Sequence, residues 1–397
     1  MHIQTNGPRI HVTVQGDGEP ALVFLHYWGG SSRTWDGVVG QLADRYRTVA
    51  IDHRGWGDSE APAQGYAIAD LANDAQDVVE ALDLRRYVLV GHSMGGKVAQ
   101  LLASRRPRGL AGVVLVAPSP PSPMALPDEQ RAAMVSAYAS RESVSQVLDH
   151  ALTANRLEPA HREQAIADSL RGAPQAKTAW PIAGMLEDIT GEVGAIDVPV
   201  VVIAGEFDQV DRVETLRKEL LPRIAGACLH VLPRVGHLLP LEAPAALAAL
   251  IRQFAGKLDA DRAANGPGTP EQVPVAFDAA FNAGDIDGML AVFSENATMR
   301  MADGKGVASG HDALRTQFSG LLKAGPRIHN EVRRSLVSGN VALVLIDWTV
   351  TVALPNGREA RQRGTATQVM VRGDDGVWKL TISNPPGIAE TAEEVVV

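Results

Sequence analysis

The sequence has a single cysteine, few aromatic residues and no excess of positive charge. Because Cys228 is alone, an internal disulfide and any cysteine-rich zinc or iron–sulfur site are excluded. The 37 basic residues are outnumbered by 46 acidic ones, without the basic stripe that nucleic-acid binding needs. No apolar run approaches the ~18 residues of a membrane span, and residues 1–5 lack the charged-then-apolar pattern of a secretory signal. We therefore expect a soluble cytoplasmic protein without nucleic-acid or membrane partners.

The remaining composition is that of a folded protein with a large core. Hydrophobic residues make up 45% and charged residues 21% of the chain, which is ordinary for globular domains. At roughly 100–200 residues per domain, a chain of 397 residues has room for two domains.

Residues 1–258 alternate short apolar runs with helical patterns. Several runs are apolar throughout, as expected for strands that are covered on both faces. Strands that alternate with helices predict a mainly parallel α/β sheet, and residues 1–14 read as an antiparallel hairpin at its edge. The predicted strands are Ala21–His26, Thr48–Asp52, Tyr87–Gly91, Leu110–Ala117, Val200–Ala204 and Ala227–Leu232.

One connection in this part is much longer than the others. Residues 118–198 separate two predicted strands, where such connections usually have about 2–6 residues. The segment has helical patterns of its own, at Asp128–Ser140 and Glu142–Leu152. We therefore predict an inserted helical lid and not a structureless loop.

The pattern changes after residue 258. Residues 259–272 lose the apolar periodicity and are rich in Gly, Pro and charge, so we expect a linker. In residues 273–390, helical patterns come first and long alternating strands follow, which predicts an α+β domain. Residues 391–397 are expected to be a tail. The predicted strands of this part are Arg327–Val337, Asn340–Val352, Arg358–Val371 and Trp378–Ser383.

The motif Gly91-His92-Ser93-Met94-Gly95 matches G-x-S-x-G and lies directly after a predicted strand and before a helix. A tight turn there exposes the hydroxyl of Ser93, and the two flanking glycines leave room for the turn. The free N–H groups at the start of the helix would face developing negative charge. The alternative interpretation is a glycine-rich turn that contains a serine by chance.

A serine hydroxyl needs a base to take its proton. The base expected with this motif is a histidine in a later loop, with an acid between the two in chain order. Asp208 and His237 each follow one of the last two predicted strands, at the sheet edge where α/β proteins place ligands. We predict Ser93 as nucleophile, Asp208 as acid and His237 as base. Glu206 and Asp211 are rival acids.

The loop after the first apolar strand should donate one backbone N–H to an oxyanion, while Met94 donates the second. Trp28 is the preferred loop donor and Tyr27 the rival. Aromatic residues and methionines near the motif and in the lid could also line an apolar substrate pocket, although packing in the core is the alternative for each. These candidates are Tyr27, His92, Trp180 and Met185.

On these motifs, residues 1–258 resemble the α/β-hydrolase family. The stretch Asp52–Ser59 reads D-H-R-G-W-G-D-S and is similar to the structural D-x-R-G-x-G-x-S turn of that family. The resemblance implies an α/β-hydrolase sheet with a helical lid. Relatives usually have His-Gly after the early strand, whereas this chain has His26-Tyr27. Since a glycine there helps the loop to turn with a positive φ, the departure bears on the predicted oxyanion hole.

The same resemblance implies a reaction. Ser93 favours acyl chemistry, because family members that open epoxides or carbon–halogen bonds carry aspartate at this position. The expected function is hydrolysis of a carboxylic ester, lactone or related acyl substrate through an acyl-enzyme, with no metal or organic cofactor. Cofactor-free haloperoxidase or perhydrolase activity and carbon–carbon bond hydrolysis are alternatives within the family. A binding module centred on the C-terminal domain is the alternative outside it.

Residues 273–390 resemble the SnoaL-like group of the nuclear transport factor two-like superfamily. The resemblance rests on the order of the elements and on the helix start Gly310–Leu314. It implies a curved sheet that helices wrap into an open cone, and it is compatible with a homodimer formed through this domain.

One carboxylate in this part is a candidate catalytic base. In the predicted strand Asn340–Val352, the even positions from Ala342 to Val350 form an apolar face, and Asp347 interrupts the other face. A buried carboxylate is costly unless it is paired, so Asp347 could be functional. The alternative is an ordinary strand aspartate that faces solvent or pairs with Arg333.

Overall fold

The computed structural model describes residues 1–301, 306–353, 358–373, 375–387 and 393–396, without the side chains of 260–265, 324 and 393–396. The chain divides into two compact units, Met1–Leu258 and Asp259–Val397. Each unit has a hydrophobic core of its own. Within the described residues, no helix combines the length and the hydropathy that crossing a membrane would require.

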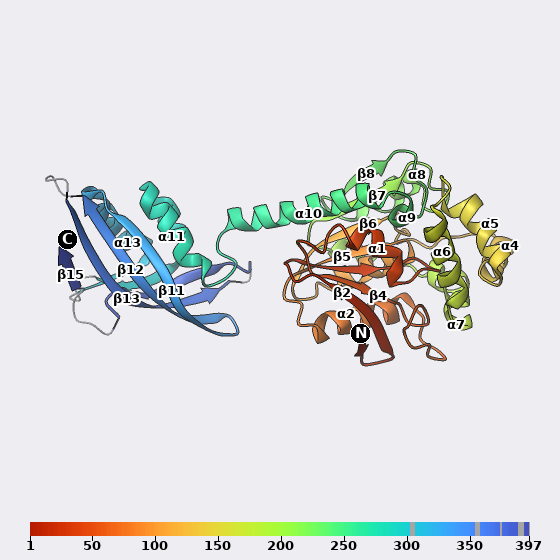
Figure 1. The fold of residues 1–397 in the computed structure, drawn as a ribbon, viewed down its shortest axis with the longest axis horizontal. Helices are drawn as coiled ribbons and strands as arrows, with labels where there is room; N and C mark the ends of the chain where they lie inside the picture. Colours follow the sequence, from red (N-terminus) through yellow and green to blue (C-terminus); the bar gives the residue numbers. More distant parts are fainter. Residues whose placement is uncertain (302–305, 354–357, 374, 388–392, 397) are drawn as a thin grey trace. The chain divides into compact units, whose positions relative to one another are not determined.

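The first domain is built on an eight-stranded sheet with the order β1-β2-β4-β3-β5-β6-β7-β8 (Figure 1). β1 and β2 form an antiparallel hairpin, β2 is antiparallel to β4, and all other neighbours are parallel. The predicted α/β sheet with an antiparallel edge is therefore confirmed. The strands are β1 (His2–Gln4), β2 (Arg9–Gln15), β3 (Ala21–Leu25), β4 (Thr48–Ile51), β5 (Tyr87–His92), β6 (Leu110–Val116), β7 (Val200–Gly205) and β8 (Cys228–Leu232).

Helices cover both faces of this sheet, which explains why its central strands are apolar throughout. β3, β4, β5 and β7 are buried at every residue. On one face, α2 (Ile68–Ala81) packs against α3 (Met94–Ser104). On the other face, Leu247 and Ile251 of α10 (Pro244–Asn265) pack with Trp35 in a second core cluster. Side chains that point to either face of the sheet thus meet apolar partners.

Helix α10 extends into the predicted linker and continues to Asn265, through the first half of residues 259–272. Residues 259–264 read D-A-D-R-A-A and lack apolar periodicity. Alanine and arginine are nevertheless strong helix formers. Apolar periodicity reports burial of a helix face, so its loss did not exclude a helix here.

The segment between β6 and β7 is a helical insertion, as predicted, and its helices lie together at one side of the first domain (Figure 1). The fully buried Lys97 of α3 donates hydrogen bonds to the carbonyl oxygens of Ser122 and Glu187, at 3.3 and 2.5 Å. These bonds tie both ends of the insertion to the core. The helices are α4 (Asp128–Ser136), α5 (Arg141–Val147), α6 (Pro159–Arg171) and α7 (Pro174–Ile182), with a π-helical turn at Leu148–Leu152.

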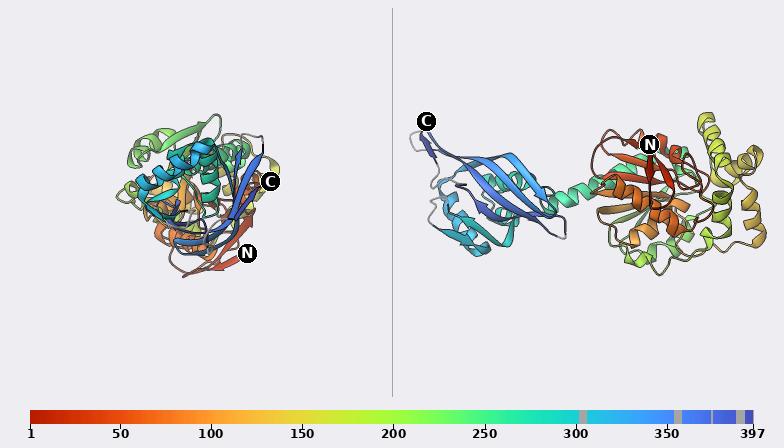
Figure 2. Two further views of the ribbon diagram at one scale, coloured as in Figure 1. Left: turned by 90° about the vertical axis from the view of Figure 1, so that its left-hand side faces the viewer. Right: turned by 90° about the horizontal axis from the view of Figure 1, so that it is seen from below.

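The described part of the second domain contains a sheet with the order β10-β9-β14-β13-β12-β11, and β15 pairs with β13. Helix α11 packs against β11 and α13 against β9, and Figure 2 shows the long twisted strands beside these helices. The predicted α+β domain is confirmed. The elements are α11 (Gln272–Ala283), α12 (Ile286–Ala291), β9 (Phe293–Arg300), β10 (Val307–Ser309), α13 (Gly310–Leu321), β11 (Arg327–Ser338), β12 (Val341–Ala353), β13 (Glu359–Arg372), β14 (Trp378–Asn384) and β15 (Glu393–Val396).

Three of these strands were not predicted. β9 mixes Ser, Glu, Asn and Thr with apolar residues, and β10 has only three residues, so neither shows a clear alternation. β15 lies in the predicted tail 391–397, where Glu393–Val396 pairs with β13. Long-range pairing determined these strands, because their own sequences carry little strand signal.

A buried ion pair holds the turn that follows β4. Arg54 donates through Nε and Nη2 to the two carboxylate oxygens of Asp74 in α2, each at 2.6 Å. In the same turn, Asp52 accepts hydrogen bonds from the amides of Ser32 and Asp58. The charged side chains of Arg54 and Asp74 are both buried, so each charge stabilises the other where water is excluded.

We expect the substitution Asp74→Asn to destabilise the first domain by about 3–5 kcal/mol, because it removes the carboxylate charge that the buried Arg54 guanidinium contacts directly. Urea denaturation followed by circular dichroism measures this loss. Glu163→Gln is the matched control, since Glu163 pairs with Arg141 at the exposed surface and such pairs contribute little. Equal effects of the two substitutions would contradict the role of the buried pair.

Candidate active site

The site is centred on the sharp turn between β5 and α3. Ser93 has φ 53° and ψ −115°, a conformation that is strained for a residue other than glycine. A Cβ at Gly91 would lie 2.4 Å from the carbonyl oxygen of Gly95, and a Cβ at Gly95 would lie 2.4 Å from that of Leu25. Both glycines are therefore required by close backbone approach, and this packing maintains the strained turn.

His237 and Asp208 are brought together at the ends of β8 and β7. Nδ1 of His237 lies 2.8 Å from Oδ2 of Asp208. The other carboxylate oxygen of Asp208 accepts hydrogen bonds from the amides of Val210 and Asp211, at 2.8 and 3.0 Å. Both side chains are buried. Because Nδ1 donates to a fixed carboxylate, Nε2 is the nitrogen left to accept a proton.

Charge and burial act in opposite directions on this pair. Burial by itself lowers the pKa of His237, but the charge and hydrogen bond of Asp208, together with the carboxyl groups of Asp211 and Glu242, leave the pKa above its usual value. Burial likewise favours a raised pKa for Asp208, but the charge and hydrogen bond of His237 lower that pKa below its usual range. The arrangement therefore strengthens His237 as a base and keeps Asp208 ionised.

The two rival acids have other partners. Glu206 accepts a hydrogen bond from the amide of Arg234 at 2.8 Å. Asp211 is buried, accepts a long hydrogen bond of 3.5 Å from the Ser119 hydroxyl, and leaves Oδ1 without a partner among the described residues. Burial raises the pKa of Asp211 to about 8, so this carboxyl is mostly protonated at neutral pH. Asp208 is the acid that contacts His237.

His92 joins the His237 loop to the turn at Ser93. Its Nε2 donates to the backbone carbonyl of His237 at 2.8 Å, and the two rings lie 5.2 Å apart. Burial lowers the pKa of His92 to about 3, so the ring is neutral. The amide of His237 is also held, by the carbonyl of Leu152 at 3.0 Å. The residue predicted to line a pocket thus makes a buried contact that positions the predicted base.

The loop after β3 turns differently from the prediction. Its positive φ is at Gly29, with φ 99°, whereas Tyr27 is not among the residues with positive φ. The expectation that Tyr27 replaces a glycine needed for this turn is therefore wrong. The carbonyl of Trp28 accepts a hydrogen bond from the Tyr138 hydroxyl at 2.8 Å, and its indole Nε1 donates to the carbonyl of Lys177 at 3.1 Å. Lid residues thus fix the loop.

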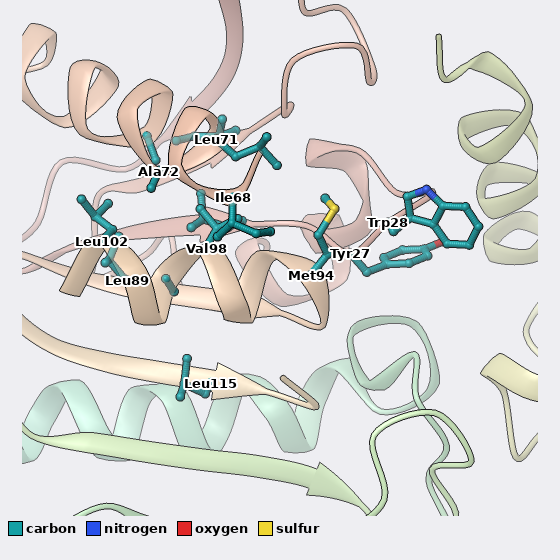
Figure 3. Packing of buried hydrophobic residues seen from close by; sticks show 14 of the residues in the cluster. Tyr27, Trp28, Ile68, Leu71, Ala72, Leu89, Met94, Val98, Leu102 and Leu115 are labelled. Carbon is teal, nitrogen blue, oxygen red and sulfur yellow. The ribbon is translucent and has the colours of Figure 1, made fainter. Parts of the chain in front are cut away.

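The predicted oxyanion donors lie at the N-terminal end of α3. Figure 3 shows Tyr27, Trp28 and Met94 at this end, and all three belong to one core cluster. Within the described residues, the backbone amides of Tyr27, Trp28 and Met94 donate no hydrogen bond. Met94 and either loop residue can therefore offer an N–H group to an oxyanion.

The lid contributes contacts that the sequence did not reveal. The Ser169 hydroxyl donates to the carbonyl of Gly29 at 2.9 Å, and the Ser31 hydroxyl donates to Asp168 at 2.8 Å. The predicted pocket residues Trp180 and Met185 are buried in the same cluster as Trp28. No local pattern marks Ser169 or Asp168, because their partners are more than a hundred residues away in the chain.

One group of described side chains has ligand atoms close enough to approach a metal ion. Those of His11, Asp52 and Asp58 lie within 4.8 Å of one another. Nδ1 of His11 already bonds to Asp52 at 2.9 Å, and Asp58 pairs with Arg171. The contacts of these carboxylates stabilise the turn after β4, so the group is a structural cross-link.

The candidate base of the second domain is not supported. Asp347 accepts hydrogen bonds from the Thr365 hydroxyl at 2.7 Å and from Nε of Arg333 at 2.9 Å. Its side chain is 39% exposed, on the face of β12 opposite to the buried Ile346 and Trp348. The bond from Thr365 and the charge of Arg333 lower the pKa of Asp347. Asp347 is therefore not a buried base, and the alternative interpretation, pairing with Arg333, is confirmed.

We expect Gly95→Ala to destabilise the first domain by about 1–3 kcal/mol, the usual cost of overpacking, because its Cβ would overlap the carbonyl oxygens of Leu25 and His26. Gly256→Ala in α10 is the matched control. Nothing lies within 4 Å of a Cβ there, so we expect a gain of about 0.5–1 kcal/mol from helix propensity. Urea denaturation distinguishes the two. A gain at both positions would contradict the close approach.

Comparisons with known proteins agree with this fold. The sequence matches the alpha/beta hydrolase fold over residues 20–144 and the SnoaL-like domain over residues 275–379. An uncharacterized protein of Mycobacterium tuberculosis is 38% identical over 111 residues, which are 28% of this chain and 32% of that protein. The match therefore spans about a third of that relative's length.

Two further comparisons cover most of the other protein. A non-heme chloroperoxidase of Streptomyces lividans is 35% identical over 212 residues, which are 49% of this chain and 76% of the relative. The structure of an esterase (EaEST) from Exiguobacterium antarcticum is similar with a TM-score of 0.60 at 24% identity, covers 64% of this chain and 98% of the esterase chain, and shows the fold alone. The chain belongs to the alpha/beta hydrolase family and carries a SnoaL-like domain at its C-terminal end.

Proposed function

We propose that the first domain is a serine hydrolase that cleaves a carboxylic ester, lactone or related acyl substrate through an acyl-enzyme on Ser93. The observation that carries this proposal is the buried hydrogen bond between Asp208 and His237. The loop of His237 is in turn held by His92, the residue before Ser93. The strained turn at Ser93 supports it, because such strain persists where the surrounding packing enforces it and clusters at active sites.

In the proposed reaction, His237 takes the hydroxyl proton of Ser93 as the serine oxygen attacks the substrate carbonyl. The described residues include no hydrogen bond between these two side chains, so the substrate complex would have to tighten this contact, as catalytic contacts often do. His237 then gives the proton to the leaving group, and water repeats the sequence on the acyl-enzyme. Asp208 stays charged and stabilises the imidazolium.

The oxyanion formed in both steps would be bound by the amides of Met94 and Trp28. The amide of Met94 is at the start of α3, where the helix dipole favours negative charge. Loss of one such donor typically costs about 10²–10³-fold in rate. The hydrogen bond from Tyr138 to the Trp28 carbonyl would hold the second donor in place, so the lid would contribute to the oxyanion hole.

A second candidate is cofactor-free peracid chemistry. It is favoured by the relative from Streptomyces lividans, which is a non-heme chloroperoxidase. Peroxide in place of water would attack the same acyl-enzyme and release a peracid. An assay with hydrogen peroxide and acetate, run beside ester hydrolysis, separates the two activities.

We expect a fluorophosphonate probe to label the wild-type chain at Ser93, because an activated serine attacks phosphorus as it attacks a carbonyl. Intact-protein mass spectrometry measures the adduct, and a panel of esters graded by acyl length measures turnover. Ser93→Ala should abolish both signals. Ser104→Ala, on the same helix but away from the turn, should keep them. Unlabelled, folded wild type would contradict the proposal.

We expect the activity to be lost as the pH falls through the raised pKa of His237, because protonation removes the base. Asp208→Asn removes the charge that raises this pKa, so the acid limb of kcat/KM should move to lower pH. The plateau should fall by roughly 10⁴-fold, as in serine proteases.

Glu206→Gln is the control for this pH profile. Glu206 accepts a hydrogen bond from the amide of Arg234 and is not among the groups that shift the pKa of His237, so a neutral amide there should leave the acid limb in place. Equal shifts of the acid limb in the two variants would contradict the role of Asp208 in raising the pKa of His237.

A further inference from the structure

The second domain encloses a cavity of about 460 Å³, which is within the ~300–1,000 Å³ of small-molecule sites. Its walls come from α11, α13 and strands of the sheet. Most of the lining is apolar, and it includes the aromatic side chains of Phe277, Phe281, Phe293, Phe318 and Trp348. An aromatic wall of this kind favours a flat or ring-containing apolar body.

The cavity lacks the groups that proton transfer needs. None of its lining residues, all of which belong to the described part of the chain, is Asp, Glu, His, Lys, Cys or Tyr. These are the side chains that act as general acids and bases. Asp347, the carboxylate that the sequence suggested as a base, lies on the opposite face of β12. The cavity is therefore built for binding and not for acid–base chemistry.

Among the described residues, the cavity is lined by a single charged side chain, that of Arg300 at one end of β9. Nη1 of Arg300 makes a long contact of 3.5 Å with the carbonyl of Gly387, and Arg300 has no carboxylate partner within the described residues. The other polar side chains that line the cavity are neutral, namely those of Gln317, Asn330, Gln362, Gln368 and Ser383. A partly buried guanidinium among apolar groups favours an anion with planar oxygens, which it can bind through two N–H groups.

We propose that this cavity binds an apolar, ring-containing molecule with one anionic group. The rings pack against the phenylalanines and Trp348, and the anion pairs with Arg300. Binding changes no covalent bond in the ligand, and it does not require the hydrolase reaction of the first domain. The C-terminal domain is thus a receptor for an apolar organic anion.

The test uses two dyes with the same aromatic body on the full chain. The anionic dye is 8-anilinonaphthalene-1-sulfonate, and the neutral dye is N-phenyl-1-naphthylamine. Fluorescence titration of the wild type should give one saturable site for each. Arg300→Gln should weaken the anionic dye about tenfold and leave the neutral dye nearly unchanged. Arg361→Gln, an exposed position of β13 paired with Glu359, should leave both unchanged.

Two further variants locate the binding. Ala366→Phe fills the cavity from β13. Leu321→Trp narrows the cavity from the end of α13, where the side chain is half exposed and a larger residue is less disruptive to the fold. Each should abolish binding of both dyes while the circular dichroism spectrum stays unchanged. Binding that survives in a folded filling variant, equal weakening of the two dyes by Arg300→Gln, or the absence of a saturable site in the wild type would overturn the proposal.

Discussion

The close approach of two backbones at Gly95 is the constraint on which the first domain depends. A Cβ at this position would overlap the carbonyl oxygens of Leu25 and His26, so only glycine lets α3 reach the end of β3. That approach places the amide of Met94 beside the loop that carries Trp28 (Figure 3). It also keeps Ser93 in a strained conformation, which neither the strand nor the helix would adopt alone.

Around this turn, buried polar contacts arrange the side chains of the candidate site. Asp208 orients His237 and raises its pKa against the effect of burial, while His92 holds the backbone of the same loop. The second domain presents the opposite case. Its cavity has aromatic walls and Arg300 but no acid–base group among the described residues that line it, so we propose chemistry in one domain and binding in the other.

The limits of sequence reasoning are visible in particular residues. The even positions of β12 from Ala342 to Trp348 are buried as the alternation predicted, because a strand with one apolar face has a single favourable orientation. Helix α10 extends into the predicted linker, since a helix can continue on propensity without apolar periodicity. The loop prediction failed at Tyr27, because the chain makes its positive-φ turn at Gly29 instead.

The sequence alone determined the α/β and α+β classes, most of the strands and the candidates Ser93, Asp208 and His237. These follow from local periodicity, from short motifs and from chain order. Only the tertiary structure decided that Asp208 rather than Asp211 contacts His237, that Tyr138 holds Trp28, and that Asp347 faces away from the core. Such contacts join residues distant in the chain, and their geometry depends on how whole elements pack, which no local pattern encodes.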